Sequence, residues 1–342
     1  MKTKVVHITE ENLSEAAREA GELLKNGEVI AIPTETVYGL AAQIYDDDAV
    51  RKIFEVKGRP QDNPLIVHIS ERSMLSALVD EIPAAAETLM DHFWPGPLTI
   101  ILKKTNCVSD IVTCGLDSVA IRFPVHPVAR AIIDATGIPL AAPSANLSGK
   151  PSPTSAEHCI HDLDGKVPLI IDGGPCSVGV ESTVISFTGK RPTLLRPGII
   201  TIEEIRSLIP DAVISPDIFR LIGSDEKVAS PGLKHKHYAP DCDVLLIDAA
   251  KSDYVDFLLK YHKEGDYAMC FDGDVPDVPI SYRTYGDSDS PEELSHNVFA
   301  VLRELESLGA KRVLIHAPGA TGKNLAVSNR LIRAAGFKVV KI

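Results

Sequence analysis

Two cations that flank a glycine are the first candidates for chemistry in this chain. Lys57 and Arg59 stand on either side of Gly58, where Pro60 prevents a preceding helical segment from continuing. Arginine offers a planar fork to a phosphate or carboxylate, and lysine offers a point charge. The pair therefore suits an anionic ligand, although a solvated helix C-terminus, where the helix dipole favours both residues, accounts for them as simply.

Other polar residues stand beside or within apolar runs. Arg122 lies in the alternating segment Val119–Phe123, and burying an unpaired charge is costly. We expect Arg122 to have a partner, either an acidic side chain or the carboxylate of a ligand. Ser144 and Asn146 follow a short apolar run, so they form either an ordinary turn or neutral donors for a phosphate or ribose. Arg196, at the end of a predicted strand, has by itself the pattern of a surface residue.

The elements that must position these residues fall into two groups along the chain. In the first part, buried strands such as Val29–Ile32 and Leu65–Val67 are mixed with helical segments. From Val244 onward, predicted strands and helices alternate, a pattern typical of a small α/β unit with a parallel sheet. The basic run Lys234–Tyr238 lies between the groups, on a Pro/Gly-rich connection. It is either a linker that crosses an anion or a solvated linker.

The segment Ala317–Asn324 comes close to a phosphate-binding loop, since it lies between a predicted strand and a predicted helix. Alanine replaces the first glycine of that motif, and Asn324 replaces the hydroxyl residue that would hold magnesium. We therefore predict an ordinary loop that starts a helix.

Length and composition exclude several classes of protein. The 342 residues are enough for two domains, and the net charge of −12 argues against a surface coated with basic residues for nucleic acid. The sequence contains neither a signal peptide nor an apolar run long enough to span a membrane, so we expect a cytoplasmic protein without a membrane partner. The six cysteines are scattered without a CxxC pair, which favours neither a zinc site nor disulfides.

Several ordered motifs resemble the threonylcarbamoyl-AMP synthase family, whose core is the YrdC-like domain. These motifs are PTETVYGL (33–40), KGRP (57–60), NPLIVH (63–68), WPGPLT (94–99), GLDSVAIRFP (115–124), APSAN (142–146), GVEST (179–183), LLRPG (194–198) and KHYAP (236–240). The likeness runs from near residue 10 to the C-terminus and fits the two-domain branch of the family. Ser118 stands where threonine is common in the family, and 209–228 matches least well.

The resemblance implies an α/β fold: a YrdC-like twisted mixed sheet, with helices around a deep concave cleft, and a smaller Rossmann-like α/β C-terminal domain. It divides the chain into a catalytic domain (1–209), a linker lying over the active site (210–241) and the C-terminal domain (242–342).

The implied reaction converts L-threonine, bicarbonate or CO2, and ATP into L-threonylcarbamoyl-AMP and pyrophosphate. The family passes this product to the tRNA threonylcarbamoyltransferase, which modifies the adenosine next to the anticodon. Mg²⁺ is expected with ATP, and no metal site of protein side chains is assigned. The alternative is an RNA-binding module that uses the concave face, but the charge of −12 favours a small anionic ligand over strong direct nucleic-acid binding.

The resemblance also assigns site residues, with Lys57 and Arg59 as the catalytic cations that face phosphate charge. The residues expected around L-threonine are Thr34, Thr36, His68, Arg122, Ala142 (through its backbone) and Ser182. Those expected around ATP are Lys57, Arg59, Asn63, Ser118, Ser144, Asn146, Ser152, Arg196 and Tyr238. We expect replacing Lys57 or Arg59 with alanine to reduce pyrophosphate release while leaving the fold intact.

Overall fold

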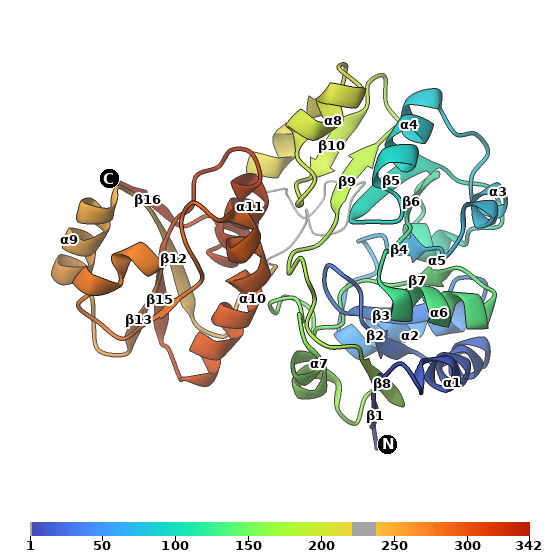
Figure 1. The fold of residues 1–342 in the computed structure, drawn as a ribbon, viewed down its shortest axis with the longest axis horizontal. Helices are drawn as coiled ribbons and strands as arrows, with labels where there is room; N and C mark the ends of the chain where they lie inside the picture. The colour runs from blue at the N-terminus through green and yellow to red at the C-terminus, as the bar shows by residue number, and fades with distance from the viewer. Residues whose placement is uncertain (1, 221–236) are drawn as a thin grey trace.

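A computed structural model of the chain describes residues 2–220 and 237–342. The described strands form two sheets, one in each of two lobes (Figure 1). The larger sheet is mixed and has the order β1-β8-β2-β3-β7-β4-β6-β5-β9-β10-β11, and the smaller one is parallel with the order β14-β13-β15-β12-β16. The predicted fold class, a twisted mixed sheet followed by a smaller α/β unit, is confirmed.

The first lobe contains β1 (Lys4–His7), α1 (Leu13–Lys25), β2 (Ile30–Ile32), β3 (Gly39–Gln43), α2 (Asp47–Lys57), β4 (Ile66–His68), α3 (Leu75–Leu78), α4 (Ala84–Phe93), β5 (Leu98–Lys103), α5 (Asp110–Thr113), β6 (Ser118–Arg122), α6 (Pro127–Thr136), β7 (Leu140–Ala141), α7 (Ala156–Leu163), β8 (Leu169–Asp172), β9 (Thr183–Ser186), β10 (Thr193–Arg196), α8 (Ile202–Leu208) and β11 (Val213–Ile214). The second contains β12 (Asp243–Asp248), α9 (Lys251–Tyr261), β13 (Asp266–Cys270), β14 (Tyr282–Thr284), α10 (Pro291–Ser307), β15 (Arg312–His316), α11 (Asn324–Ala334) and β16 (Val339–Lys341).

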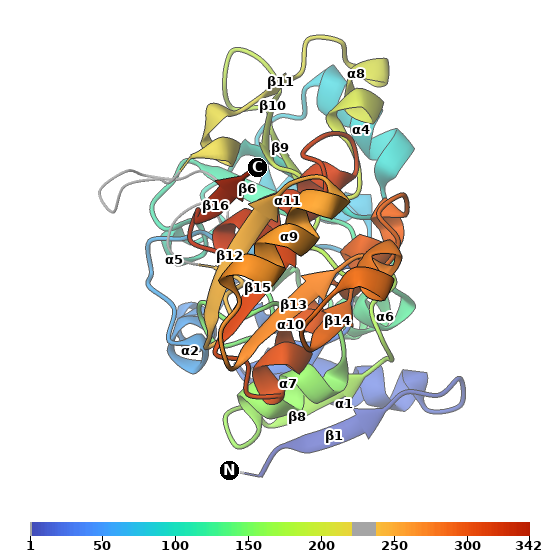
Figure 2. The ribbon, with the colours of Figure 1, turned by 90° about the vertical axis from the view of Figure 1, so that its left-hand side faces the viewer.

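Both faces of the large sheet carry helices. Ile30 and Ile32 pack into the cluster under α1 and α6, whereas Ala31 belongs to the cluster on the other face, with α2 and α4. This is the alternation expected of a strand that is buried on both faces. The small sheet is also covered on both faces, with α9 on the outside and α10 and α11 toward the first lobe (Figures 1 and 2).

Helix α2 brings the first candidate cation to a defined place. Asp46 caps its N-terminus by accepting hydrogen bonds from the backbone N–H groups of Asp48 and Ala49. Gly58 ends the helix in the left-handed conformation, with φ of 60°, which glycine adopts without strain. Lys57 is therefore the last helical residue, and Arg59 belongs to the following loop.

The two lobes share an apolar cluster. Val37 and Val180 of the first lobe pack in the same buried group as Phe299 of α10 and Leu331 of α11. Gly179 lies so close to the backbone of α10 that an added Cβ would stand 2.4 Å from the Cα of His296. The second lobe is thus packed against the first.

The predicted linker and helix-start loop can be compared with the described residues. Strand β11, within the predicted linker, extends the large sheet beside β10. Residues 221–236 of that linker, including much of the basic run, lie outside the described residues. The domain boundaries at 209 and 241 stay predictions. The loop 317–323 precedes α11, as predicted for a helix start. Among the described helices, none is long and apolar enough to cross a membrane.

Candidate active site

A pocket opens where strands and loops of the first lobe converge beside residues 237 and 238. It is lined by the loop between β2 and β3, the loop before β4, the ends of β4, β6 and β10, and the segment before β9. Its described lining residues are Thr34, Thr36, Val37, Tyr38, Gly39, Arg59, Pro64, Ile66, His68, Arg122, Ala142, Pro143, Ser144, Glu181, Ser182, Arg196, His237 and Tyr238.

Strand register brings two predicted threonine-site residues together. β4 and β6 are parallel, and His68 pairs with Arg122 at their carboxyl ends. The His68 Nδ1 lies 3.2 Å from the carbonyl oxygen of Ile66. A carbonyl only accepts, so Nδ1 carries the proton and Nε2 is left as an acceptor. Burial and the charge of Arg122 lower the pKa of His68 to about 3, so the imidazole is neutral at physiological pH.

Arg122 has an acidic partner and also lines the pocket. Its Nη2 lies 2.7 Å from Oε1 of Glu35, and its Nη1 donates to Oγ1 of Thr36 at 2.7 Å. Within the described residues, its Nε and Nη2 have no hydrogen-bond acceptor in good geometry. Thr36 in turn contacts the hydroxyl of Thr34 at 3.0 Å. The sequence left open whether Arg122 pairs with an acidic side chain or with a ligand carboxylate. The structure allows both, since Arg122 contacts Glu35 and also lines the pocket.

Two further arginines face the same space. Arg196 is buried, not on the surface as its local sequence indicated, and donates to the backbone oxygen and the hydroxyl of Ser182 at 3.1 Å. Arg59 donates through Nη2 to the carbonyls of Asn63 and Pro64 at 2.9 and 3.2 Å. Burial lowers the pKa of each arginine to about 10, so both remain cationic at neutral pH. Three cations around one pocket favour an anionic ligand.

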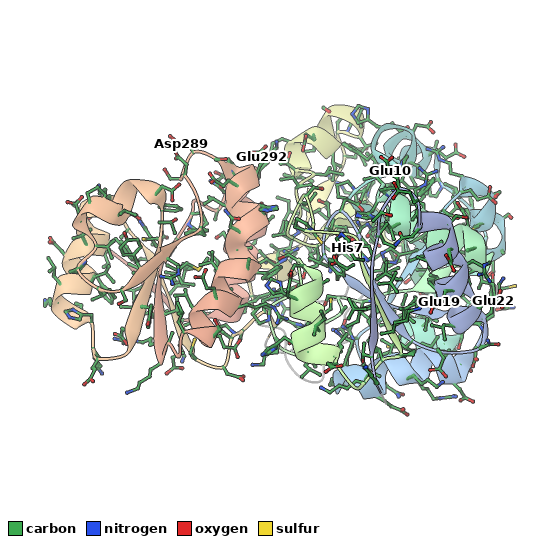
Figure 3. All side chains as sticks on the ribbon, turned by 60° about the horizontal axis from the view of Figure 1, so that its bottom comes forward. His7, Glu10, Glu19, Glu22, Asp289 and Glu292 are labelled. Carbon is green, nitrogen blue, oxygen red and sulfur yellow. The ribbon has the colours of Figure 1, made fainter. Side chains whose placement is uncertain are left out.

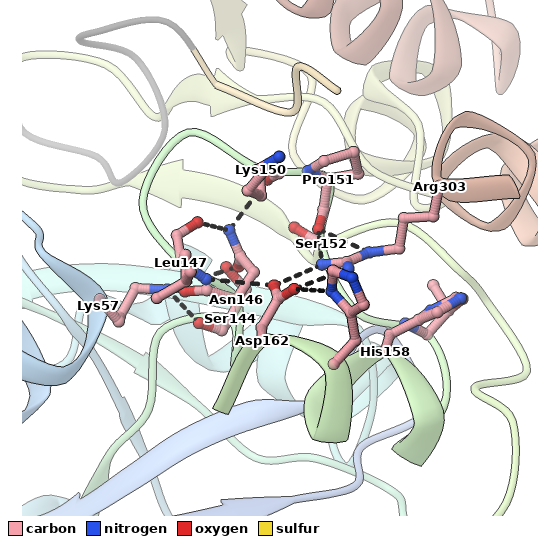
Figure 4. Close-up of polar contacts among 12 residues, drawn as sticks. Lys57, Ser144, Asn146, Leu147, Lys150, Pro151, Ser152, His158, Asp162 and Arg303 are labelled. Atoms are coloured by element: carbon pink, nitrogen blue, oxygen red, sulfur yellow. Dashed lines mark hydrogen bonds and ion pairs between the residues drawn. The ribbon is translucent and has the colours of Figure 1, made fainter. Parts of the chain in front are cut away.

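Lys57 lies behind the pocket wall and is not among its described lining residues. Its Nζ donates to the backbone oxygens of Ser144 and Asn146, the second at 2.6 Å (Figure 4). The side-chain amide of Asn146 donates to the carbonyls of Leu147 and Lys150 at 2.7 and 2.9 Å. Lys57 and Asn146 therefore shape the loop that presents Ser144, while Ser144 itself lines the pocket.

The other predicted residues divide in the same way. The lining includes Thr34, Thr36, Arg59, His68, Arg122, Ala142, Ser144, Ser182, Arg196 and Tyr238. Lys57, Asn63, Ser118, Asn146 and Ser152 are buried and are not among the described lining residues. Ser152 is an example: its hydroxyl donates to Oε1 of Glu181, a residue of the lining.

Sequence reasoning missed two acids, Glu35 and Glu181, and the partner of the second, Arg330. Glu35 and Glu181 stand inside the quoted motifs, between apolar or hydroxyl residues, and both are buried. Their position inside these motifs was the available signal, since a carboxylate that is buried there requires a cation. Glu181 finds its cation in Arg330 of α11, with 2.6 Å between Oε2 and Nε. Nothing in the first half of the sequence could identify a partner so far along the chain.

A pocket with three arginines, hydroxyl groups and a neutral histidine, at strand ends of an α/β sheet, defines a protein that binds a small anionic ligand. A family model described as "Telomere recombination" matches residues 22–198, and one described as "Threonylcarbamoyl-AMP synthase, C-terminal domain" matches 200–336. The chain belongs to the threonylcarbamoyl-AMP synthase family.

Individual relatives agree over the full length. The threonylcarbamoyl-AMP synthase of Bacillus subtilis is 42% identical, with 100% of both chains covered. The enzyme of that name from Pyrococcus abyssi is 40% identical over 99% of this chain and 100% of its own. A crystal structure of P. abyssi Sua5 complexed with L-threonine superposes with a TM-score of 0.92 at 40% identity, over 99% of this chain and 100% of that one.

Proposed function

We propose that this pocket forms L-threonylcarbamoyl-AMP and pyrophosphate from L-threonine, bicarbonate or CO2, and ATP. The observation that carries the proposal is the group of three arginines, Arg59, Arg122 and Arg196, around one space that also holds a neutral histidine. Every reactant except CO2 is an anion or carries a carboxylate. The carbamate of threonine attacks the α-phosphate of ATP, so catalysis needs positioning and cations but no nucleophilic side chain.

The threonine end of the pocket is assigned to Arg122 and its neighbours. The Nε and Nη2 groups of Arg122 form the edge of the guanidinium that can take a carboxylate in two parallel hydrogen bonds. Thr36 and Ser182 supply hydroxyl groups, His68 an acceptor nitrogen, and Ala142 its backbone. The threonine amine must be uncharged to attack CO2, and a pocket with a neutral His68 beside a fixed cation favours that form.

The nucleotide end is assigned to Arg59, Arg196, Ser144 and Tyr238. Arg59 offers its Nε, which has no acceptor among the described residues, and Arg196 stands at the strand end where the backbone approaches Ser182. Lys57 acts through the Ser144 loop in this arrangement. Asn63, Ser118, Asn146 and Ser152 are buried outside the described lining, and their contact with ATP stays a prediction.

We propose that the pocket widens when ATP binds. The space open to the centre of a water-sized molecule is about 50 Å³, whereas one water needs roughly 10–15 Å³ on that measure. Tyr238 and His237 form part of the wall, and both belong to the segment that joins the lobes. A pocket that closes over its reactants also shields a labile carbamate from water.

Mg²⁺ is proposed to enter on the phosphates of ATP, where it neutralises charge. Among the residues the structure describes, no three His, Cys, Asp or Glu side chains gather as a metal site. The two acids at the pocket, Glu35 and Glu181, each face an arginine. This donor set does not fit a resident magnesium ion, which prefers available oxygen ligands.

Exposed acids on both lobes favour a small ligand over a phosphate backbone. Glu22 on α1, Asp289 and Glu292 are exposed and lie on outer faces of the molecule (Figure 3). We propose that the adenylate leaves the pocket for the tRNA threonylcarbamoyltransferase, without strong direct binding of this chain to nucleic acid.

The test is pyrophosphate release by the purified protein with ATP, Mg²⁺ and bicarbonate, with and without L-threonine. We expect release that requires threonine and is much weaker with L-serine, which lacks the methyl group. Absence of release, together with salt-sensitive RNA binding, would replace this proposal with the nucleic-acid alternative.

A further inference from the structure

Glu181 is an unusual group for a pocket that binds a triphosphate. It lines the pocket beside Ser182 and is buried, with 7% of its surface exposed. A negative charge in a low-dielectric pocket repels an anionic ligand unless a cation compensates it. The nucleotide end of the pocket therefore depends on how Glu181 is neutralised.

The compensating cation comes from the other lobe. Arg330 of α11 is fully buried, with 0% of its surface exposed, and its Nε lies 2.6 Å from Oε2 of Glu181. Its Nη2 also approaches the backbone oxygen of Glu181 at 3.4 Å, and its Nη1 donates to Oδ1 of Asn329 at 3.1 Å. The other carboxylate oxygen of Glu181 accepts the hydroxyl of Ser152. Both carboxylate oxygens are thus engaged by protein donors.

These contacts keep the Glu181 carboxylate ionised and balance its negative charge with a nearby cation. Burial raises the pKa of Glu181, but the charges of Arg330 and Arg196 outweigh burial, and the net pKa is lowered. The carboxylate remains ionised, and its charge is balanced chiefly by Arg330. Arg196 can then offer its charge to a ligand.

The same arginine supports the tyrosine wall of the pocket. The guanidinium carbon of Arg330 lies 5.5 Å from the ring centroid of Tyr238. On α10, Phe299 lies 5.3 Å from Tyr238 between ring centroids. Tyr238 is held in the left-handed region, with φ of 66°, a conformation that a bulky residue adopts only when its surroundings impose it.

We propose that Arg330 is a positioning residue of the nucleotide pocket, through which the C-terminal lobe neutralises Glu181 and supports Tyr238. The inference rests on the proposed function, because it assumes that ATP binds beside Glu181. It gives the C-terminal lobe a role in ATP affinity, although that lobe contributes no residue to the described lining apart from the joining segment at 237 and 238.

The test compares the direction in which two single substitutions, each made in the full chain, change the affinity for ATP. Arg330→Gln leaves the Glu181 charge uncompensated, so ATP–Mg²⁺ affinity without threonine, measured by calorimetry, should fall at least about tenfold. Threonine affinity should change less than about threefold. Glu181→Gln removes the repelling charge and should not weaken ATP binding. The double variant should return ATP affinity to within about threefold of the natural protein, because both charges are gone.

A merely structural role makes different predictions. It expects Glu181→Gln, which leaves Arg330 buried and unpaired, to weaken ATP binding as much as Arg330→Gln does. That result, or a double variant that folds but binds ATP as poorly as Arg330→Gln, would overturn the proposal. If Arg330→Gln does not fold, the ATP affinities of Glu181→Gln and of the double variant are each compared with that of the natural protein. The proposal expects no weakening in the first and a change of less than about threefold in the second.

A control is available on β15. Arg312 is also an arginine of the C-terminal lobe that pairs with an acid, with its Nε 3.1 Å from Oδ1 of Asp266. Neither residue is among the described lining residues of the pocket. Arg312→Gln should lower thermal stability without changing the Kd for ATP more than about threefold. If the natural protein shows no threonine-dependent pyrophosphate release, the proposed function fails; if it does and the Arg330 variants bind ATP normally, only this inference fails.

Discussion

Replacing Lys57 with methionine should affect stability at least as much as chemistry. The ammonium group is buried and donates to two backbone carbonyls of the Ser144 loop, with the side-chain oxygen of Asn146 at 3.5 Å. Burial lowers the pKa of Lys57 well below its usual value, so each hydrogen bond contributes between about 1 kcal/mol, as from a neutral donor, and about 3 kcal/mol, as from a charged one. A buried carbonyl left without a donor costs about 1–3 kcal/mol. Methionine keeps the packing and avoids the cost of burying a charge, so we expect a net loss of about 3 kcal/mol.

The assay is thermal unfolding of the ligand-free protein, followed by circular dichroism. For a domain of 150–250 residues, 1 kcal/mol corresponds to roughly 2–4 °C, so Lys57→Met should lower the Tm by about 6–12 °C. Arg59→Met is the matched comparison. Arg59 is half-buried, and its hydrogen bonds to described residues are local, to Asn63 and Pro64. Its loss should therefore lower the Tm by less than about 4 °C and act mainly on ATP affinity.

One outcome would refute this reasoning. If Lys57→Met unfolds within about 2 °C of the natural protein yet loses pyrophosphate release, the lysine acts directly on a ligand and not through the Ser144 loop. The sequence alone predicted that outcome for both Lys57 and Arg59. That prediction stays untested, and the contacts of Lys57 with the Ser144 loop are the reason to expect an effect on stability as well.

Three further predictions concern the threonine site, pH and the lobe interface. Arg122→Ala should raise the KM for threonine at least about tenfold and the KM for ATP less than about threefold, because a carboxylate loses its bidentate donor; equal effects would count against that role. Folding lowers the pKa of His68 from 6.5 to about 3, so as the pH falls His68 is protonated in the unfolded chain before it is protonated in the folded protein. The stability that neutral His68 contributes is therefore complete above about pH 6.5 and is lost as the pH falls toward 3. The dependence of Tm on pH from 7 to 4.5 should therefore flatten in His68→Asn, and an unchanged slope would show that other groups dominate. Gly179→Ala adds a Cβ 2.4 Å from the backbone of α10, whereas Gly174→Ala, at a similar φ, meets no atom within 4 Å; both carry left-handed strain of about 1 kcal/mol, but only Gly179→Ala should lower the Tm by much more than that.

The fold could be predicted to the extent that burial leaves a pattern in the sequence. The runs Val29–Ile32 and Leu98–Leu102 are apolar because both faces of the sheet are covered, and both are strands in the structure. β3, Gly39–Gln43, was missed. Its small residues carry little strand propensity, and its position comes from antiparallel pairing with β2 and β7. Such pairing is a property of the sheet and not of the segment.

The site was predictable by residue type but not by direction. The motifs identified Arg59, Arg122 and Arg196, and all three face one pocket. Lys57 is also basic and lies two residues from Arg59. As the last residue of α2, however, it directs its side chain to the backbone of the Ser144 loop and not into the pocket. Position at a helix end favours a cation through the helix dipole. It does not say whether that cation faces a ligand or a carbonyl.

The acids explain how the protein can bury several arginines around one pocket. Glu35 pairs with Arg122 and Glu181 with Arg330, and the Glu181 charge also reaches Arg196. Each acid reduces the cost of burying cations in the free protein. The Glu35 contact lacks good hydrogen-bond geometry among the described residues, whereas Glu181 is held firmly by Arg330 and Ser152. A ligand carboxylate can therefore compete with Glu35 for Arg122 without breaking a strong hydrogen bond, while Glu181 stays fixed as a phosphate arrives. The difference between the two acids separates a threonine end, where an anion can be exchanged, from a nucleotide end, where the charge is balanced in advance by the C-terminal lobe.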